Sequence, residues 1–149
     1  MFYLDAIRDP GNMGSLIRLA DWFGVEAVIC SSDCVEWTNP KVIQASMGSF
    51  IRKTPFVEAG EPGSFLAGKN RVIAADLAGE DLYREFGGFA GIFIISNEAN
   101  GLSSVLEPII TSKVHIPSPT GSAESLNAAT AAAVLLGELT RRQLTGQLK

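Results

Sequence analysis

IPSPTGSAESLNAATAAAVLLGEL, residues 116–139, is the stretch on which the fold depends most. It opens with an apolar residue before proline, which favours extended backbone, and continues into a Pro, Thr, Gly and Ser loop that disfavours regular structure. Ser125 is predicted as a helix N-cap, and Arg141 and Arg142 stand where a helix C-terminus favours positive charge. The helix between them is apolar on every face, so solvent is not expected on any of them.

Two interpretations of this stretch remain open from its composition. It is typical of a buried C-terminal core helix. Alternatively, Ser125, Leu126 and Asn127 stand at the mouth of the helix, behind a flexible loop, and this position suits a small polar ligand.

Length and composition predict one domain, residues 1–149. Hydrophobic residues make up 46% and charged residues 19% of the chain, which argues against disorder. The most apolar run is rich in Ala and contains Asn127 and Thr130, so no membrane span is predicted, and no signal-peptide pattern occurs.

The cysteines and the net charge limit the partners. Cys30 and Cys34 are the only cysteines and His115 is the only histidine, so no metal site is expected. Reduced thiols favour a cytoplasmic protein. The net charge of −4 lacks the basic footprint of a domain that grips nucleic acid alone. RNA binding would therefore need a local basic patch or another domain.

Apolar runs alternate with helical patterns along the chain. Strands are predicted at residues 1–7, 27–30, 51–57, 71–77, 91–96 and 112–117, and helices at 14–23, 39–48 and 63–68, within 97–106, and after Ser125. This order predicts an α/β fold with a largely parallel sheet of about six strands flanked by helices. Ligands of such sheets collect at the carboxyl ends of the strands, where three turns are expected, residues 9–14, 96–101 and 117–125.

Each of these turns carries polar residues with a possible chemical role. Asn12 and Arg18 lie on one helix, whose open N-terminus and guanidinium suit phosphate, although a capping Asn and a solvated Arg are common in any helix. Ser96, Asn97 and Glu98 follow the most apolar strand, where a carboxylate could orient a ligand or simply belong to a polar turn. Ser125, Leu126 and Asn127 form the third group.

Together these stretches resemble the SpoU-type, or TrmH-like, RNA ribose 2′-O-methyltransferases of the SPOUT class. The D-x-I-x-D-P-x-N-x-G-x-x-x-R motif occurs at residues 5–18, G-N-E-G-x-G-L-S at residues 96–103, and I-P followed by S-L-N at residues 116–127. The stretch NPKVIQASMGSF, residues 39–50, is also similar to the family. Ser96 and Ala99 replace two glycines of the second motif, and Ala99 would restrict a turn that needs a positive φ.

The resemblance implies a deep C-terminal trefoil knot that holds a bent S-adenosylmethionine. By motif position, the residues of its pocket would be Leu77, Ser96, Asn97, Gly101, Ile116 and Leu126. It also implies a homodimer, with the first and last helices in the interface. Family members often carry an N-terminal RNA-binding domain, so we expect either a catalytic-domain fragment or a single-domain member.

The implied reaction moves the methyl group of the cofactor to a ribose 2′-hydroxyl of tRNA or rRNA. Arg18, reaching the site from the partner subunit, is expected to clamp the neighbouring phosphate and stabilise the developing oxyanion, because an arginine holds its proton too tightly to act as a base. The phosphate or water would accept the proton. The residues expected to fix Arg18, the ribose and the cofactor are Asn12, Glu98, Ser125 and Asn127.

Two alternatives belong to other classes. An inactive homologue could keep the knot and the dimer and only bind RNA or a partner, against which Asn12, Arg18, Glu98 and Asn127 argue. A different nucleotide-binding α/β enzyme is disfavoured, because the chain has no G-x-G-x-x-G after its first strand and no P-loop.

Overall fold

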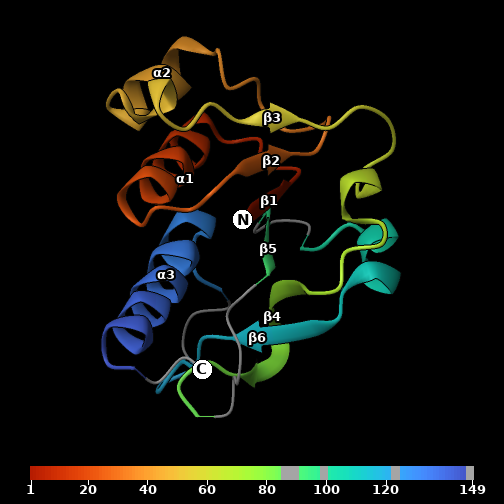
Figure 1. Ribbon diagram of the computed structural model, residues 1–149, viewed down its shortest axis with the longest axis vertical. Helices are drawn as coiled ribbons and strands as arrows, with labels where there is room; N and C mark the ends of the chain where they lie inside the picture. Colours follow the sequence, from red (N-terminus) through yellow and green to blue (C-terminus); the bar gives the residue numbers. More distant parts are fainter. Residues whose placement is uncertain (85–90, 98–100, 122–124, 147–149) are drawn as a thin grey trace.

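The centre of the molecule is a six-stranded sheet in which every pair of neighbouring strands is parallel. The computed structural model describes residues 1–84, 91–97, 101–121 and 125–146. The strand order is β3-β2-β1-β5-β4-β6 (Figure 1). The strands are β1 (Phe2–Asp5), β2 (Val28–Cys30), β3 (Phe56–Val57), β4 (Val72–Asp81), β5 (Ile92–Ser96) and β6 (Ser112–His115). The predicted α/β fold with a largely parallel sheet is therefore confirmed.

Helices cover both faces of this sheet. On one side lie α1 (Pro10–Trp22), α2 (Pro40–Ser46) and α3 (Ala128–Leu144), and the short 3-10 helix η1 (Ser49–Ile51) packs against α1 and α2 (Figure 1). On the other side lie the 3-10 helices η2 (Ser64–Leu66) and η3 (Ser104–Ile109). Because all strands run in one direction, their carboxyl ends lie along a single edge of the sheet.

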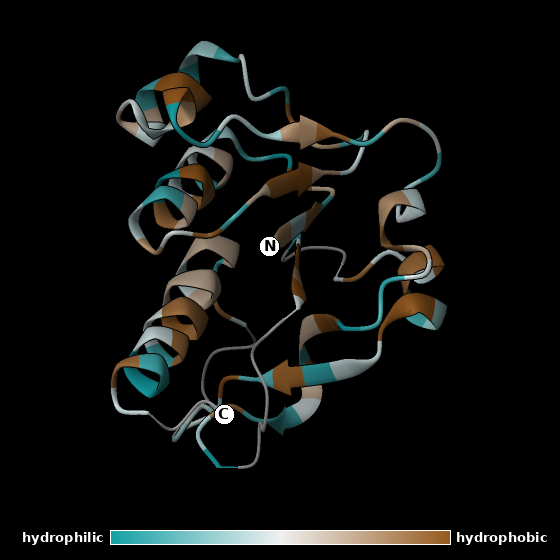
Figure 2. Cartoon of the chain, viewed as in Figure 1, coloured by the Kyte–Doolittle hydropathy of each residue, from teal (hydrophilic) through white to brown (hydrophobic). Residues whose placement is uncertain are grey.

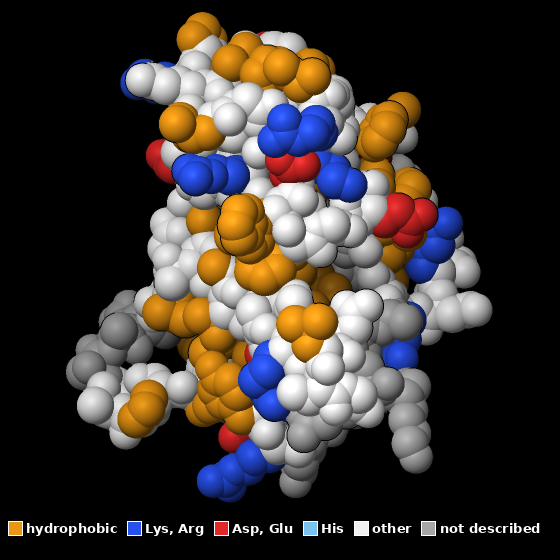
Figure 3. All heavy atoms as spheres, turned by 60° about the vertical axis from the view of Figure 1, so that its left-hand side comes forward, with side chains coloured by type: hydrophobic (Ala, Val, Ile, Leu, Met, Phe, Trp, Pro, Cys, Tyr) orange, Lys and Arg blue, Asp and Glu red, His pale blue; other side chains and the backbone are white. Residues whose placement is uncertain are grey.

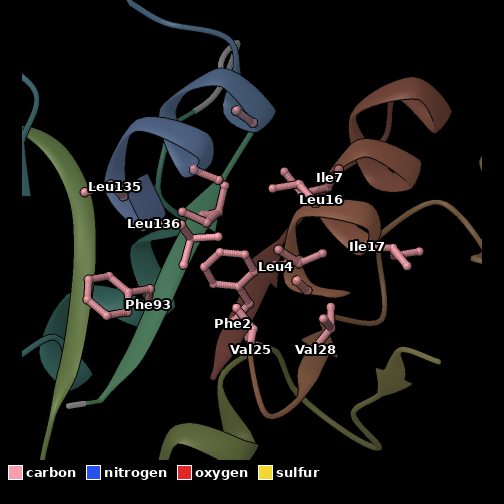
Figure 4. Packing of buried hydrophobic residues seen from close by; sticks show 14 of the residues in the cluster. Phe2, Leu4, Ile7, Leu16, Ile17, Val25, Val28, Phe93, Leu135 and Leu136 are labelled. Carbon is pink, nitrogen blue, oxygen red and sulfur yellow. The ribbon is translucent and has the colours of Figure 1, made fainter. Parts of the chain in front are cut away.

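The strands bury side chains on both faces, as the alternation of a strand requires. Phe2 and Leu4 of β1 point into the core beneath the long helices, whereas Tyr3 points into a second core beneath η2 and η3. Phe93 of β5 and Leu136 of α3 join the first core (Figure 4). Colouring by hydropathy shows β2 and β5 in brown near the centre of the molecule, between layers of mixed character (Figure 2). Each large side chain buried in this way contributes about 1.5–3 kcal/mol.

The close packing of α1 on α2 depends on Gly14. A Cβ at this position would lie 2.5 Å from Ala45 Cβ and 2.7 Å from the Val42 carbonyl oxygen. Both distances are shorter than real Cβ contacts, so only glycine lets the two helices approach this closely. The Gly of the first motif therefore fixes the helix that carries Asn12 and Arg18.

Several predicted boundaries were wrong. The last helix begins at Ala128 and its N-cap is Asn127, not Ser125, because the Asn127 carboxamide oxygen accepts the Ala129 and Thr130 N–H groups. The first helix begins at Pro10 rather than residue 14, since Asp9 caps it.

Two other predicted elements are shorter than expected. In the predicted strand 51–57, only residues 56 and 57 pair with β2, since Pro55 has no N–H to donate. The predicted helix 63–68 is the 3-10 helix η2.

The remaining expectations concern the chain path and its surroundings. The expected knot depends on how the connections that contain residues 85–90 and 122–124 cross, and these residues lie outside the described ranges. No helix in the described part of the chain has both the length and the apolar character needed to cross a bilayer. Among the same residues, no group of three or more His, Cys, Asp and Glu side chains is arranged to hold a metal ion.

Candidate functional site

A cavity of about 290 Å³ opens at the carboxyl edge of the sheet, where β4, β5 and β6 end and α3 begins. Its walls come from three segments that are far apart in the sequence, near residues 75–77, 95–102 and 114–131. All six residues that the resemblance placed around the cofactor line it: Leu77, Ser96, Asn97, Gly101, Ile116 and Leu126. That these residues bind the cofactor remains a prediction.

A bulge in β4 forms the first wall. The pairing of β4 with β6 shifts register between Ala75 and Glu80, so the residues between them leave the sheet. Gly79 permits this path, because a Cβ there would lie 2.4 Å from the Val114 nitrogen. The bulge leaves Leu77 71% exposed at the cavity.

Polar contacts fix the bulge in place. His115 Nδ1 lies 2.8 Å from the Gly79 carbonyl oxygen, to which it donates. Lys113 Nζ lies 2.9 Å from Asp76 Oδ2. The Ala78 N–H and then the Lys113 ammonium, which both donate to the Asp76 carboxylate, lower the pKa of Asp76 from its ordinary value. Asp76 therefore stays ionised at neutral pH and holds β4 to β6.

The turn after β5 forms the second wall. Asn97 Nδ2 donates to the Ala6 carbonyl oxygen at 3.1 Å, which ties this turn to the end of β1. The Gly101 N–H donates to the Asn97 carbonyl oxygen at 2.9 Å. Gly101 has φ of +65°, a conformation that glycine adopts at no steric cost. The first and second motifs thus meet at the cavity.

The start of α3 forms the third wall. Ser125 and Leu126 line the cavity, and Leu126 is 43% exposed. Next to them, Asn127 Nδ2 donates to Asn12 Oδ1 at 2.7 Å, across 115 positions of sequence. This bond joins the N-terminal turn of α1 to the N-cap of α3, so the first and third motifs also meet here.

The five predicted catalytic residues do not all lie at the cavity of a single chain. Ser125 lines the cavity, while Asn12 and Asn127 bind each other beside it. Arg18 is exposed on α1, does not line the cavity of its own chain, and forms no ion pair with another described residue. Glu98 lies outside the described residues.

Two polar lining residues were not predicted from the sequence. Asp76 lines the cavity from the bulge within β4, and His115 lines it as the last residue of β6. The signal for His115 was its position, because the side chains that end parallel strands surround the ligand site of such sheets. His115 was instead interpreted as a packed or edge histidine.

The cavity has the character of a small-molecule site. Aliphatic side chains make up much of its wall, among them Ile95, Val114 and Ile116, and a few polar groups converge on it from Ser96, Asn97 and Ser125. Its volume is near the lower end of the range for such sites. This arrangement suits a ligand with a flat apolar part and a polar tail.

Comparison with known proteins identifies the family. The model of the SpoU rRNA methylase family matches residues 1–137. The chain is 33% identical, over 96% of its length and 53% of the relative, to the 23S rRNA (uridine(2479)-2′-O)-methyltransferase of Streptomyces viridochromogenes. It is 30% identical, over 96% of its length and 58% of the relative, to the 23S rRNA (guanosine-2′-O-)-methyltransferase RlmB of Neisseria meningitidis serogroup B. The chain spans about half the length of these curated relatives.

Solved structures give the same result. The SpoU methyltransferase AviRb of Streptomyces viridochromogenes in complex with AdoMet matches with a TM-score of 0.85 and 29% identity, over 97% of this chain and 60% of that one. An AdoMet-bound rRNA methyltransferase of Sinorhizobium meliloti matches with a TM-score of 0.83 and 29% identity, over 95% of this chain and 55% of that one. The motifs, the parallel sheet and these matches lead to one conclusion: the chain belongs to the SpoU rRNA methylase family.

Proposed function

We propose that this chain transfers the methyl group of S-adenosylmethionine to a ribose 2′-hydroxyl of ribosomal or transfer RNA. The observation that carries the proposal is the cavity at the carboxyl edge of the sheet, where all three family motifs meet. Relatives that match nearly the whole chain are named as 2′-O-methyltransferases of 23S rRNA. Two similar structures contain the same cofactor.

The residues around the cavity suit S-adenosylmethionine. Ile95, Val114 and Leu126 provide apolar surface for a purine ring, and Ser96, Asn97 and Ser125 provide hydrogen-bonding groups for ribose and amino-acid atoms. When bound, the cofactor supplies a methyl group that its positively charged sulfur has already activated. The protein then has to align the ribose oxygen and assist its loss of a proton, and alignment alone is worth roughly 7–11 kcal/mol.

Arg18 is the residue proposed to act on the RNA. Its guanidinium offers a planar set of donors that matches a phosphate, and its exposure leaves it accessible to a large substrate. Because it does not line the cavity of its own chain, we assign it to the cavity of a second copy. There it would hold the phosphate next to the target ribose and stabilise the negative charge that develops on the 2′-oxygen, while the phosphate or water takes the proton.

The helical side of the molecule supports a homodimer. Ala133, Val134 and Leu139 of α3 remain only half-buried in a single chain, and Trp22 at the end of α1 is 83% exposed. Figure 3, in which the helical side comes forward, shows hydrophobic side chains at this surface among Lys and Arg side chains. A second copy would cover this apolar surface and bring Arg18 to the neighbouring cavity.

The cysteines support a cytoplasmic location. Cys30 and Cys34 are free thiols, and reducing compartments keep thiols unpaired.

The assignment of Arg18 is tested with Arg18→Ala. Without the guanidinium we expect turnover to fall by about 10²–10³-fold or more, because this donor acts on charge that develops in the transition state. Cofactor affinity should not change, since Arg18 is proposed to contact the RNA phosphate and not the cofactor. Turnover is measured as transfer of tritium from labelled cofactor to RNA, and affinity by calorimetry.

Arg71→Ala is the matched control. Arg71 is also exposed, but it precedes β4 at the opposite edge of the sheet, so both turnover and affinity should be retained. Full turnover by Arg18→Ala would contradict the role of Arg18. If the unchanged protein bound RNA but no cofactor, the inactive RNA-binding homologue would replace the enzyme as the preferred function.

A further inference from the structure

A buried carboxylate outside the cavity holds the second wall of the cavity. Asp5 ends β1, is fully buried, and pairs with Ser96 of β5 in the sheet. Both carboxylate oxygens accept hydrogen bonds from one residue, Ser103. Its N–H donates to Oδ2 at 2.8 Å and its hydroxyl donates to Oδ1 at 2.7 Å. Asp5 does not itself line the cavity.

These bonds attach residues next to the cavity to the end of β1. Ser103 comes directly after Gly101 and Leu102, which are lining residues. At the other end of the turn, the Asn97 N–H donates to the Asp5 carbonyl oxygen at 3.2 Å, next to the bond between Asn97 Nδ2 and Ala6. Asn97 and Ser103 are therefore both attached to Asp5, and Asn97 is also attached to Ala6, which follows β1.

The backbone at this attachment point is strained. Ala6 has φ of +51°, a left-handed conformation that residues with a Cβ rarely adopt. Its N–H donates to Ser31 Oγ at 3.0 Å, so both of its backbone polar groups are bonded. Strained residues persist where their surroundings fix them, and they concentrate at functional sites.

A carboxylate at this buried position needs an explanation. Burial of a charged group is unfavourable unless hydrogen bonds replace water, and here both oxygens are bonded to the turn. The bonds hold residues 101–103 in place before any ligand arrives. Because a site ordered during folding loses less entropy on binding, such order raises ligand affinity.

We propose that Asp5 is a positioning residue for the cofactor: through Ser103 it holds the lining residues Gly101 and Leu102 where they bind S-adenosylmethionine. The proposal rests on the proposed function, since it assigns the cavity to that cofactor. Asp5 is proposed to touch neither the cofactor nor the RNA. Its substitution should therefore act through the lining residues and change the affinity for the cofactor.

The test measures S-adenosylmethionine affinity by calorimetry, and the thermal unfolding midpoint, for a set of variants. Asp5→Ala should weaken binding by about tenfold, because it leaves the Ser103 donors without their acceptor. Ser103→Ala, which keeps its N–H, should weaken binding by about threefold. The double variant should bind no more weakly than Asp5→Ala alone, since the Ser103 hydroxyl then has no partner left to lose. Asp5→Asn should retain most of the affinity, because its carboxamide can still form hydrogen bonds with Ser103.

Glu58→Ala is the matched control for a loss of stability alone. Glu58 is also a buried carboxylate, and it accepts the Gly63 N–H at 2.8 Å and the Phe65 N–H at 3.1 Å, in a loop that does not line the cavity. This variant should unfold at a lower temperature and bind the cofactor as the unchanged protein does.

The outcomes separate this inference from the proposed function. If the unchanged protein binds the cofactor and a folded Asp5→Ala binds it equally well, the role of Asp5 is overturned and the proposed function stands. If Asp5→Ala does not fold, Ser103→Ala decides, and unchanged affinity in that variant overturns the inference. If the unchanged protein binds no cofactor, the proposed function fails and the inference fails with it.

Discussion

Single side chains decide where the three motifs meet. Asn127 caps α3 with its oxygen and binds Asn12 with its nitrogen, so one side chain both starts a helix and joins two distant turns. Gly14 and Gly79 act through the space they leave, since a Cβ at either position would overlap backbone atoms of a neighbouring element. Ala6 does the opposite: it keeps its Cβ in a conformation that favours glycine.

The strain at Ala6 predicts a stabilising substitution. Ala6→Gly should raise the free energy of unfolding by about 0.5–1 kcal/mol, because relief of the left-handed strain outweighs the extra backbone entropy of glycine. The measurement is urea denaturation at neutral pH. Ala67→Gly provides the comparison: Ala67 is exposed and has φ of −56°, so the same change should lower stability there. A fall in stability in both variants would contradict the strain at Ala6.

Among the secondary structure elements, α3 has a charged anchor near its C-terminal end. Glu138 is 9% exposed, and its carboxylate accepts Arg141 Nε at 2.8 Å and Arg142 Nε at 2.7 Å. Arg142 also donates to the Leu82 carbonyl oxygen after β4. The bonds from Arg141 and then Arg142 lower the pKa of Glu138 to about 2. One buried carboxylate thus ties the end of α3 to the end of β4.

The lowered pKa of Glu138 predicts acid sensitivity. A carboxyl whose pKa falls on folding contributes stability above its unfolded value, here the ordinary 4.5, and this contribution is lost as the pH falls toward 2. The unchanged protein should therefore lose more thermal stability between pH 5 and pH 3 than Glu138→Gln, which has no carboxyl to protonate. Equal losses in both proteins, measured by calorimetric scans, would show that Glu138 contributes nothing to the acid response.

The sequence predicted the elements better than their ends. Apolar runs identified five of the six strands closely, because strands that are buried on both faces leave a clear pattern. The sixth strand, β3, is shorter than predicted: only two residues after Pro55 pair with β2. Local composition does not reveal which residues form hydrogen bonds to a neighbouring strand. Ser125 and Asn127 are both residue types that favour the N-cap position, so the sequence alone does not distinguish them. In the structure Asn127 is the N-cap, and its side chain also bonds to Asn12.

The site could be predicted to a similar extent. Parallel strands bring their carboxyl ends to one edge, so the meeting of the three turns followed from topology, and the family motifs selected the lining residues. The bonds between Asp5 and Ser103 could not be predicted, because they join residues 98 positions apart in the sequence. The bulge of β4 was also not predicted. Gly79 is needed there because the Val114 backbone lies close to it, and this contact between distant residues is not visible in the sequence.

For the whole molecule, the proposed dimer divides each active site between two chains. Every cavity would take its walls from one copy and Arg18 from the other, so a single chain would bind the cofactor without methylating RNA. This proposed arrangement would account for the apolar surface of α1 and α3 and for the exposed position of Arg18.

The shared site predicts that two inactive variants restore each other. Arg18→Ala keeps an intact cavity, whereas Leu126→Arg fills the cavity and keeps Arg18; Leu126 is 43% exposed, so the fold should tolerate the change. Co-expressed in equal amounts, the two variants should recover about a quarter of the turnover of the unchanged protein, because half of the dimers are mixed and each has one complete site. A mixture as inactive as its components would rule out the transfer of Arg18 between chains.

The cavity also bears on how the protein is made. Its lining residues include the first turn of α3 as well as the bulge of β4. A ribosome that has translated most of the chain has still produced no complete cavity, and α3 has to leave the exit tunnel before one can form. A product of early termination that lacks α3 would therefore lack the cavity that we propose for the methyl donor.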